Sequence, residues 1–142
     1  MKFHRTVTVA FVLVGFLPLL FAAGCASTAK KLTPAQIETL QPSGKLVNGV
    51  RVVNVQAKRY EFIPDPIVVR SGEKVRVKLT SLDVTHGFAL PAYKINVRIE
   101  PHKVSTAEFT AGKEGAYPIH CSVFCGWGHP FMKATLVVLP AK

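Results

Sequence analysis

The sequence predicts an all-β domain, a β-sandwich or a Greek-key barrel, that follows a flexible N-terminal tether. From Leu46 onward the chain offers six to eight short strand candidates within about 95 residues, rich in β-branched and aromatic side chains. Turn-forming residues separate these candidates, and no stretch after residue 45 keeps a helical period. Many short strands with turns between them are typical of a sandwich or a Greek-key barrel.

The clearest strand candidate is the stretch KVRVKLT, residues 74–80. Basic side chains alternate there with valine and leucine, as expected of a strand with one face in water. The chain of 142 residues is long enough for one such domain with a core. Further strand candidates are VRVVNVQA (50–57), IVVR (67–70), VSTAEFT (104–110), GAYPIHC (115–121) and ATLVVLP (134–140).

The first 24 residues have the pattern of an export signal. A basic start, MKFHR, precedes an uncharged run of 17 residues that ends at Ala23. A retained membrane helix is the alternative, but such a span needs about 20 residues. Gly15 and Pro18 also interrupt this run. We therefore expect a signal peptide over 1–24.

Cys25 extends this interpretation, because the stretch FAAGC resembles a bacterial lipobox. Such a resemblance implies that Cys25 is lipidated and becomes the new N-terminus. Residues 25–45 would then be a lipidated N-terminus and linker, in which Pro34 could begin a helical turn or two. The domain at 46–142 would lie in the periplasm or extracytoplasmic space, anchored to the outer face of a bacterial membrane.

The charge balance is basic, with a formal net charge of +10. Removal of Lys2 and Arg5 leaves 16 basic against 8 acidic residues, a net charge of +8. Most of this charge is expected on exposed strand faces, where it could attract anionic lipids or an acidic protein. The charges are scattered and the chain is exported, so nucleic acid is not an expected partner.

Four potential metal ligands lie within the stretch CSVFCGWGHPFM, residues 121–132. Cys121, Cys125 and His129 are spaced as on one helix face, but two glycines and a proline disfavour a helix here. We expect a loop instead, wrapped around a ligand. A Cys121–Cys125 disulfide remains an alternative in an oxidising compartment, although it leaves His129 and Met132 without a role.

Thiolate, imidazole and thioether groups together favour copper. Iron–sulfur clusters normally need more than two cysteines, and thioether is a poor ligand for zinc. Copper accepts all three, often with a weak axial methionine. The missing second imidazole is best supplied by His86, in SLDVTHGFALP, because His120 on a strand next to Cys121 points to the opposite face.

These two motifs resemble the CuA domain of cytochrome c oxidase subunit II, over roughly Val50 to Leu139. The family pattern is D-V-x-H, which ends in the ligand histidine, followed later in the chain by C-x₃-C-G-x-G-H-x₂-M. The resemblance implies a cupredoxin-like Greek-key β-sandwich that holds two copper ions. The copper ligands that it implies are His86, Cys121, Val123 through its carbonyl, Cys125, His129 and Met132.

The resemblance implies a one-electron transfer module rather than a complete enzyme. Its expected partners are a cytochrome c-like donor and a haem–copper oxidase catalytic subunit. A periplasmic copper-delivery protein and a stand-alone single-copper cupredoxin remain alternatives. The chain departs from the family at Gln56 and Lys58, where tryptophans linked to electron entry would stand, and in its lipoprotein-like start.

Two residues near the motifs have two possible roles each. Asp83 could orient the His86 ring, or it could serve as a turn residue that bonds its own backbone. Trp127 could pack over the site, or it could lie exposed on an electron path or docking surface.

Overall fold

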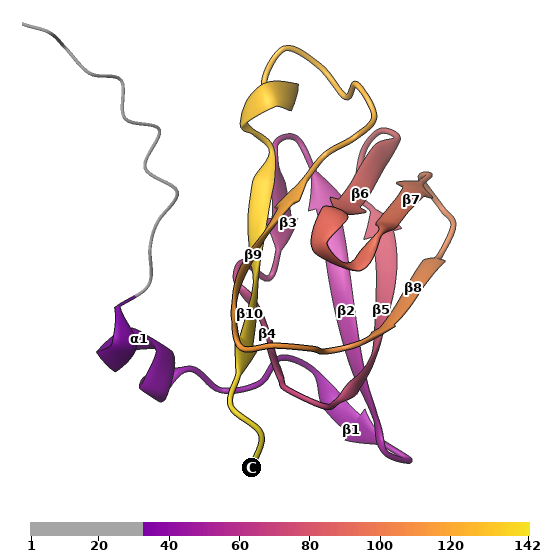
Figure 1. Cartoon of the computed structure of the whole chain (residues 1–142). Coiled ribbons are helices and arrows are strands. Elements are labelled where there is room, and N and C mark those ends of the chain that lie inside the picture. The colour runs from indigo at the N-terminus through magenta and orange to yellow at the C-terminus, as the bar shows by residue number, and fades with distance from the viewer. Residues whose placement is uncertain (1–32) are drawn as a thin grey trace, which may run out of the picture. The chain divides into compact units, whose positions relative to one another are not determined.

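The computed structural model describes residues 33–142, which form a sandwich of two five-stranded sheets (Figure 1). This arrangement confirms the predicted fold class. The predicted signal peptide and Cys25 lie outside the described residues. The elements are α1 (Pro34–Thr39), β1 (Lys45–Val47), β2 (Val50–Lys58), β3 (Glu61–Ile63), β4 (Ile67–Arg70), β5 (Lys74–Ser81), β6 (His86–Leu90), β7 (Ile95–Ile99), β8 (Ser105–Thr110), β9 (Gly115–His120) and β10 (Lys133–Leu139), with 3₁₀ turns at Pro91–Tyr93 and His129–Phe131.

The sheets mix parallel and antiparallel pairs. The first has the strand order β1-β2-β5-β8, with β3 also paired to β2, and the second has the order β4-β10-β9-β6-β7. Strands β2 and β5 are parallel, as are β4 and β10, whereas the other named pairs are antiparallel. The chain crosses from the first sheet to the second between β5 and β6 and again between β8 and β9, and this brings β6 beside β9.

The core forms because alternate residues of the strands face inward. Strand β5 buries Val75, Val77 and Leu79 while its basic residues face water, as the sequence predicts. Facing layers meet in aromatic contacts, such as the edge-to-face pair of Phe62 and Phe88, whose ring centroids lie 5.6 Å apart. The cysteines of the metal-ligand motif belong to this same buried cluster.

Strand β6 lies in a segment where the sequence offered no strand candidate. Strand β6 begins at His86 itself, and all five of its residues are buried. It pairs with β7, which places His86 opposite Ile99. A fully buried strand shows no alternation of polar and apolar residues, so periodicity could not identify it.

The last part of the predicted linker packs on the domain. Ile37 and Leu40 contact a small apolar cluster on the second sheet, formed by Val68, Val137 and Leu139. Ser43 Oγ accepts a hydrogen bond of 2.9 Å from the N–H of Val68. The helix α1 begins at Pro34, as expected. Among the described residues, no helix has both the length and the apolar character that a membrane span requires.

A partly buried ion pair lies where the two parallel strands of the first sheet, β2 and β5, begin. Arg51 donates two hydrogen bonds to Glu73, of 2.5 and 2.6 Å, and both side chains are less than one fifth exposed. Glu73 also accepts from the N–H of Arg70. Burial alone would raise the pKa of Glu73, but these hydrogen bonds and the arginine charges outweigh it, and the pKa is lowered from 4.5.

Candidate metal centre

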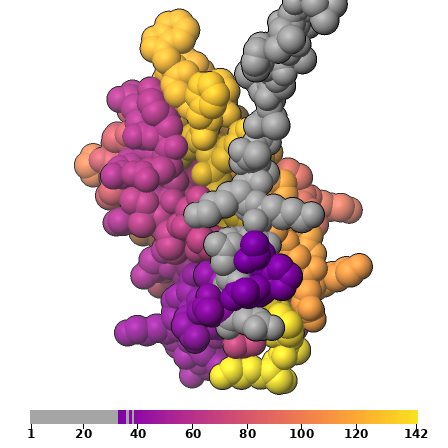
Figure 2. All heavy atoms as spheres, turned by 90° about the vertical axis from the view of Figure 1, so that its left-hand side faces the viewer, coloured from indigo at the N-terminus to yellow at the C-terminus, as the bar shows by residue number. Residues whose placement is uncertain are grey.

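The ligand loop, residues 121–132, connects β9 to β10 at one end of the sandwich. The N–H of Cys121 donates to the carbonyl of Met132 at 3.1 Å, which closes the base of the loop. In Figure 2 the gold atoms of this segment project at the upper end of the face shown, and the indigo atoms of α1 lie near its lower end. The predicted loop conformation is therefore present, with one 3₁₀ turn at His129–Phe131.

The five predicted ligand side chains lie close together. Two of them, the cysteines, supply a pair of sulfur atoms, and the other three lie beside that pair. The Sγ atoms of Cys121 and Cys125 are 3.8 Å apart, well beyond the length of about 2.05 Å that a disulfide has. His86 Nδ1 lies 3.9 Å from Cys121 Sγ. His129 Nδ1 and Met132 Sδ lie 3.8 and 3.7 Å from Cys125 Sγ.

The remaining predicted ligand, the carbonyl of Val123, also faces the sulfur pair. Its oxygen lies 3.1 Å from Cys121 Sγ and accepts a hydrogen bond from that thiol. A main-chain oxygen does this with any side chain, so valine is compatible with the role. All six predicted positions therefore gather in one place.

The separations and the donor types fit a soft metal ion. Two atoms that bind one ion are separated by less than the sum of their bond lengths. This sum is about 4.6 Å for two sulfurs and about 4.3 Å for sulfur and nitrogen, taking ordinary metal–ligand distances. The Sγ–Sγ separation of 3.8 Å and the Sγ–Nδ1 separations of 3.9 Å at His86 and 3.8 Å at His129 lie below these limits. Together with a thioether, this donor set matches copper better than a hard cation.

Burial makes it unfavourable to ionise both cysteine thiols unless a cation is bound beside them. Cys121, Cys125, His86 and Met132 are each at most 4% exposed, whereas His129 is half-buried. Burial raises the pKa of the Cys125 thiol to about 11, and the neighbouring Cys121 adds to the rise. Two thiolates this close would repel one another, so a bound cation would be needed to hold both sulfurs ionised.

Asp83 fixes which nitrogen of His86 faces the sulfurs. Its Oδ1 lies 2.7 Å from His86 Nε2 and accepts from the N–H of Val84, while Oδ2 accepts from the N–H of Arg59. Burial alone would raise the pKa of Asp83, but these hydrogen bonds outweigh it and lower the pKa to about 2. An ionised carboxylate only accepts, so Nε2 carries the proton and Nδ1 is free to bind a metal. Asp83 thus takes both of the roles considered for it.

The first turn of the ligand loop lies against β6. The N–H of Gly87 points to Cys121 Sγ at 3.5 Å, and the carbonyl of Gly87 accepts from the N–H of Ser122. A Cβ atom at Gly87 would overlap the Ser122 hydroxyl, which itself donates to Asn96 Oδ1 at 2.6 Å. Glycine at this position therefore lets the strand that carries His86 approach the first cysteine.

The second half of the loop lies against Tyr60, in the turn between β2 and β3. A Cβ atom at Gly126 would lie 2.6 Å from the Tyr60 hydroxyl, and one at Gly128 would overlap the ring. Gly126 also has a φ of +133°, which other residues rarely adopt. The two glycines of the motif therefore admit the tyrosine ring beside the loop.

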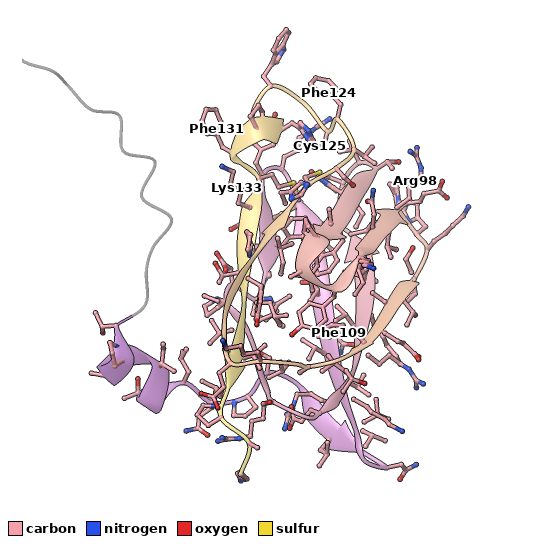
Figure 3. All side chains as sticks on the ribbon, in the orientation of Figure 1. Arg98, Phe109, Phe124, Cys125, Phe131 and Lys133 are labelled. Carbon is pink, nitrogen blue, oxygen red and sulfur yellow. The ribbon has the colours of Figure 1, made fainter. Side chains whose placement is uncertain are left out.

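The outer side of the loop carries an aromatic patch, formed by Phe124, Trp127 and Phe131. These side chains are 71%, 93% and 81% exposed. Figure 3 shows Phe124 and Phe131 at the upper end of the domain, beyond Cys125. The Phe124 ring centroid lies 5.8 Å from that of the half-buried His129. Of the two roles considered for Trp127, its exposure excludes packing over the site.

Sequence reasoning missed the contacts that the loop receives from distant strands. Arg59 donates to the carbonyl of Cys125 at 2.8 Å, although 66 positions separate them. Ser122 and Gly87 were also not singled out, and no contact with the loop was expected of Tyr60. No local pattern marks these residues, because their contacts depend on how the two sheets stack.

Comparison with protein families matches residues 35–139 to the family described as Cytochrome C oxidase subunit II, periplasmic domain. Two proteins from Thermus thermophilus named Cytochrome c oxidase subunit 2 are each 42% identical over 86 residues, or 61% of this chain. The chain spans 64% and 51% of their lengths. Nitrous-oxide reductase from Cupriavidus necator is 31% identical over 110 residues, which are 74% of this chain and 17% of that protein.

Solved structures share the fold. The periplasmic domain of subunit II of cytochrome oxidase from Bradyrhizobium japonicum aligns with a TM-score of 0.60 at 24% identity, over 71% of this chain and 88% of that one. A chain of a heme-copper terminal oxidase dimer aligns with a TM-score of 0.60 at 25% identity, over 80% of each chain. The family match covers most of the sequence and the fold agrees with it, so this chain belongs to the family of cytochrome c oxidase subunit II periplasmic domains.

Proposed function

We propose that this domain is a one-electron transfer module that holds a binuclear copper centre of the CuA type. The observation that carries the proposal is the buried pair of free cysteine sulfurs, 3.8 Å apart, with a histidine nitrogen beside each of them. A single-copper site needs one thiolate, and a second buried thiolate has no role there. A bridging pair uses both.

The proposed ligands divide between the two ends of the sulfur pair. Cys121 and Cys125 would bridge two ions, with His86 beside the first sulfur and His129 beside the second. Met132 and the carbonyl of Val123 would be weak ligands, as their positions at 3.7 Å from Cys125 Sγ and 3.1 Å from Cys121 Sγ allow. Copper held by these residues would supply one-electron redox chemistry, with the charge shared between the two ions.

The protein's contribution is a rigid ligand frame. Three of the ligand side chains are almost fully buried in the core cluster, and the His86 ring is held by Asp83. Ligands that do not move when the charge of the site changes keep the barrier to electron transfer low. The aromatic patch above the half-buried His129 is the proposed surface at which an electron partner meets the domain.

The partners and the location are part of the same proposal. The electron donor would be a cytochrome c-like protein, and the acceptor a haem–copper oxidase catalytic subunit. Support comes from the resemblance to a heme-copper terminal oxidase chain and to subunit II periplasmic domains. Cleavage after residue 24 and lipidation of Cys25 would anchor the domain, 46–142, on the outer side of the membrane.

Copper counting and electron paramagnetic resonance test the proposed centre. The reduced full chain in detergent would be loaded with copper, the ions per chain counted and the spectrum recorded. Two coppers that share one unpaired electron give a seven-line hyperfine pattern, whereas one copper gives four lines. One ion per chain with a four-line pattern would contradict the proposal and favour a single-copper cupredoxin or a delivery protein.

Three variants make this test specific. Cys121→Ser should abolish the seven-line signal, because it leaves a single thiolate at the site. Cys25→Ala removes the only other cysteine of the chain and should leave both the signal and the copper count unchanged. A Val123→Ala variant should also keep the signal, since the carbonyl remains.

Electron delivery through the aromatic patch is tested by Trp127→Ser. This side chain is 93% exposed, so its removal should leave copper binding and stability unchanged. Electron exchange with a reduced cytochrome c-like donor, followed by stopped-flow absorbance, should slow several-fold. An unchanged rate would place the donor's contact elsewhere on the domain.

A further inference from the structure

Arg59 contacts the metal centre from two sides. It lies in the turn between β2 and β3, and its Nε donates to the carbonyl of Cys125 at 2.8 Å. Its main-chain N–H donates to Asp83 Oδ2 at 2.9 Å, while the other oxygen of Asp83 lies 2.7 Å from His86 Nε2. One residue is therefore hydrogen-bonded to the main chain of the second cysteine and to the carboxylate that orients the first histidine.

We propose that Arg59 is a positioning residue that couples the two histidine–cysteine halves of the metal centre and raises its reduction potential. The second part of this inference, the raised reduction potential, rests on the proposed electron-transfer function. Its first part, the positioning of the loop, concerns the protein before any metal is bound.

The pairing of the guanidinium supports a positioning role. Within residues 33–142, no carboxylate lies within ion-pair distance of the Arg59 side chain, although its neighbour Lys58 pairs with Glu61 at 2.8 Å. The Arg59 side chain instead donates to a main-chain carbonyl inside the ligand loop. A planar guanidinium fixes the direction of such a hydrogen bond better than a lysine ammonium, which is compact and flexible.

A packed ring beside the hydrogen bond from Arg59 also holds the ligand loop in place. The adjacent residue, Tyr60, packs against Gly126, which immediately follows Cys125 in the loop, and against Gly128. The turn therefore holds the loop through one hydrogen bond and one packed ring. Because the same turn also holds Asp83, a shift of Cys125 relative to His86 would have to break a contact of Arg59.

The charge of Arg59 has a separate consequence. A permanent positive charge close to the site favours the state that carries one more electron. Arg59 as a whole is exposed, so water screens part of this effect, but the hydrogen bond of 2.8 Å to the Cys125 carbonyl holds the guanidinium against the ligand loop. Loss of the charge should therefore lower the reduction potential.

Three variants of the full chain separate the two effects. Arg59→Gln removes both the charge and the directed guanidinium, whereas Arg59→Lys keeps the charge. Lys58→Gln is the matched control, because it removes a neighbouring charge that contacts Glu61 and not the ligand loop. Each variant is compared with the wild type in three measurements.

Hydrogen–deuterium exchange of the loop peptide, residues 121–132, is measured first on metal-free protein. Arg59→Gln and Arg59→Lys should exchange several-fold faster there, and Lys58→Gln should match the wild type. Copper release to a chelator should be about tenfold faster in Arg59→Gln, as for other residues that orient metal ligands. The potential should fall in Arg59→Gln and stay near that of the wild type in Arg59→Lys.

Wild-type exchange and potential in Arg59→Gln would overturn the inference, as would equal shifts in Lys58→Gln. If Arg59→Gln does not fold, Arg59→Lys supplies the exchange and copper-release tests. The exchange experiment involves no copper. A wild-type chain that binds one ion would therefore contradict the proposed function, while the loop-positioning result for Arg59 would still stand or fall on its own.

Discussion

Asp83 and His86 are joined by a hydrogen bond of 2.7 Å between Oδ1 and Nε2, and the histidine ring is fully buried. The carboxylate lies in the turn at the surface, whereas the other side of the ring faces the sulfur pair. This relationship makes an acidic residue at the surface a determinant of a buried metal ligand.

Replacement of Asp83 should weaken copper binding. Asp83→Ala leaves His86 free to rotate and to bond through either nitrogen, and loss of such partners typically costs about 10- to 100-fold in metal affinity. Copper affinity is measured by competition with a chelator. Glu61→Gln is the control, since Glu61 is exposed and forms an ion pair with Lys58 at the end of β2. Equal affinity in Asp83→Ala and the wild type would show that the carboxylate does not orient the ligand.

Met132→Leu should change the electronic properties of the site and not the fold. The side chain is fully buried, and leucine has a similar volume, so the loss of stability should be at most about 1.5 kcal/mol. A thioether donates electron density to oxidised copper, and its loss should raise the reduction potential. Voltammetry of the copper-loaded chain measures the shift. A lowered or constant potential would contradict an axial role for Met132.

Gly128→Ala should destabilise the metal-free protein by about 1–3 kcal/mol, because the added methyl group overlaps the Tyr60 ring. The backbone at Gly128 has a φ of −83°, so alanine meets no conformational strain and the effect is purely steric. Urea unfolding measures the change. Gly112→Ala is the matched control, since the nearest atom to its Cβ is 3.9 Å away. Similar losses in both variants would indicate that contact with Tyr60 is not the cause.

Glu73→Gln should destabilise the protein at neutral pH by about 2 kcal/mol, because it leaves Arg51 without its charged partner. The folded-state pKa of Glu73 is lowered, so its stabilising contribution is complete above the ordinary value of 4.5. It is lost as the pH falls from there through the lower folded-state pKa.

Urea unfolding of wild type and Glu73→Gln at pH 7 and at pH 3 measures this dependence, and the difference between them should shrink at the lower pH. Glu108→Gln supplies the comparison. Its partner, Arg76, is 44% exposed and Glu108 is 59% exposed, so the loss there should be below about 1 kcal/mol. A constant difference across the pH range would exclude the ionised pair as its source.

The ligand motif could be predicted because its chemistry is local. Cys121, Cys125, His129 and Met132 lie on one loop, and their spacing limits them to a site that they share. His86 could be predicted because it was the best-placed imidazole for a donor set that lacked one. Strand β5 was predictable for a similar reason, since the alternation of basic and apolar residues within it indicates which side chains face water and which face the core.

What supports the ligands could not be predicted, because it depends on the stacking of the sheets. The run HGFAL is buried on both faces and therefore has no alternation, so β6 was not among the strand candidates. Arg59 and Tyr60 reach the loop across the sandwich, and neither residue type suggests such a contact. The packing of Ile37 and Leu40 within a segment of linker composition was equally invisible in the sequence.

Trp127 is the only tryptophan in the sequence, and it stands almost fully exposed on the ligand loop. Its indole emission therefore comes from one known place, two residues after the second cysteine and two before the second histidine. Light absorbed by the protein at the red edge of the aromatic band is consequently re-emitted beside the metal centre. The chain carries its own optical probe of copper uptake, redox change and partner contact, with no label attached.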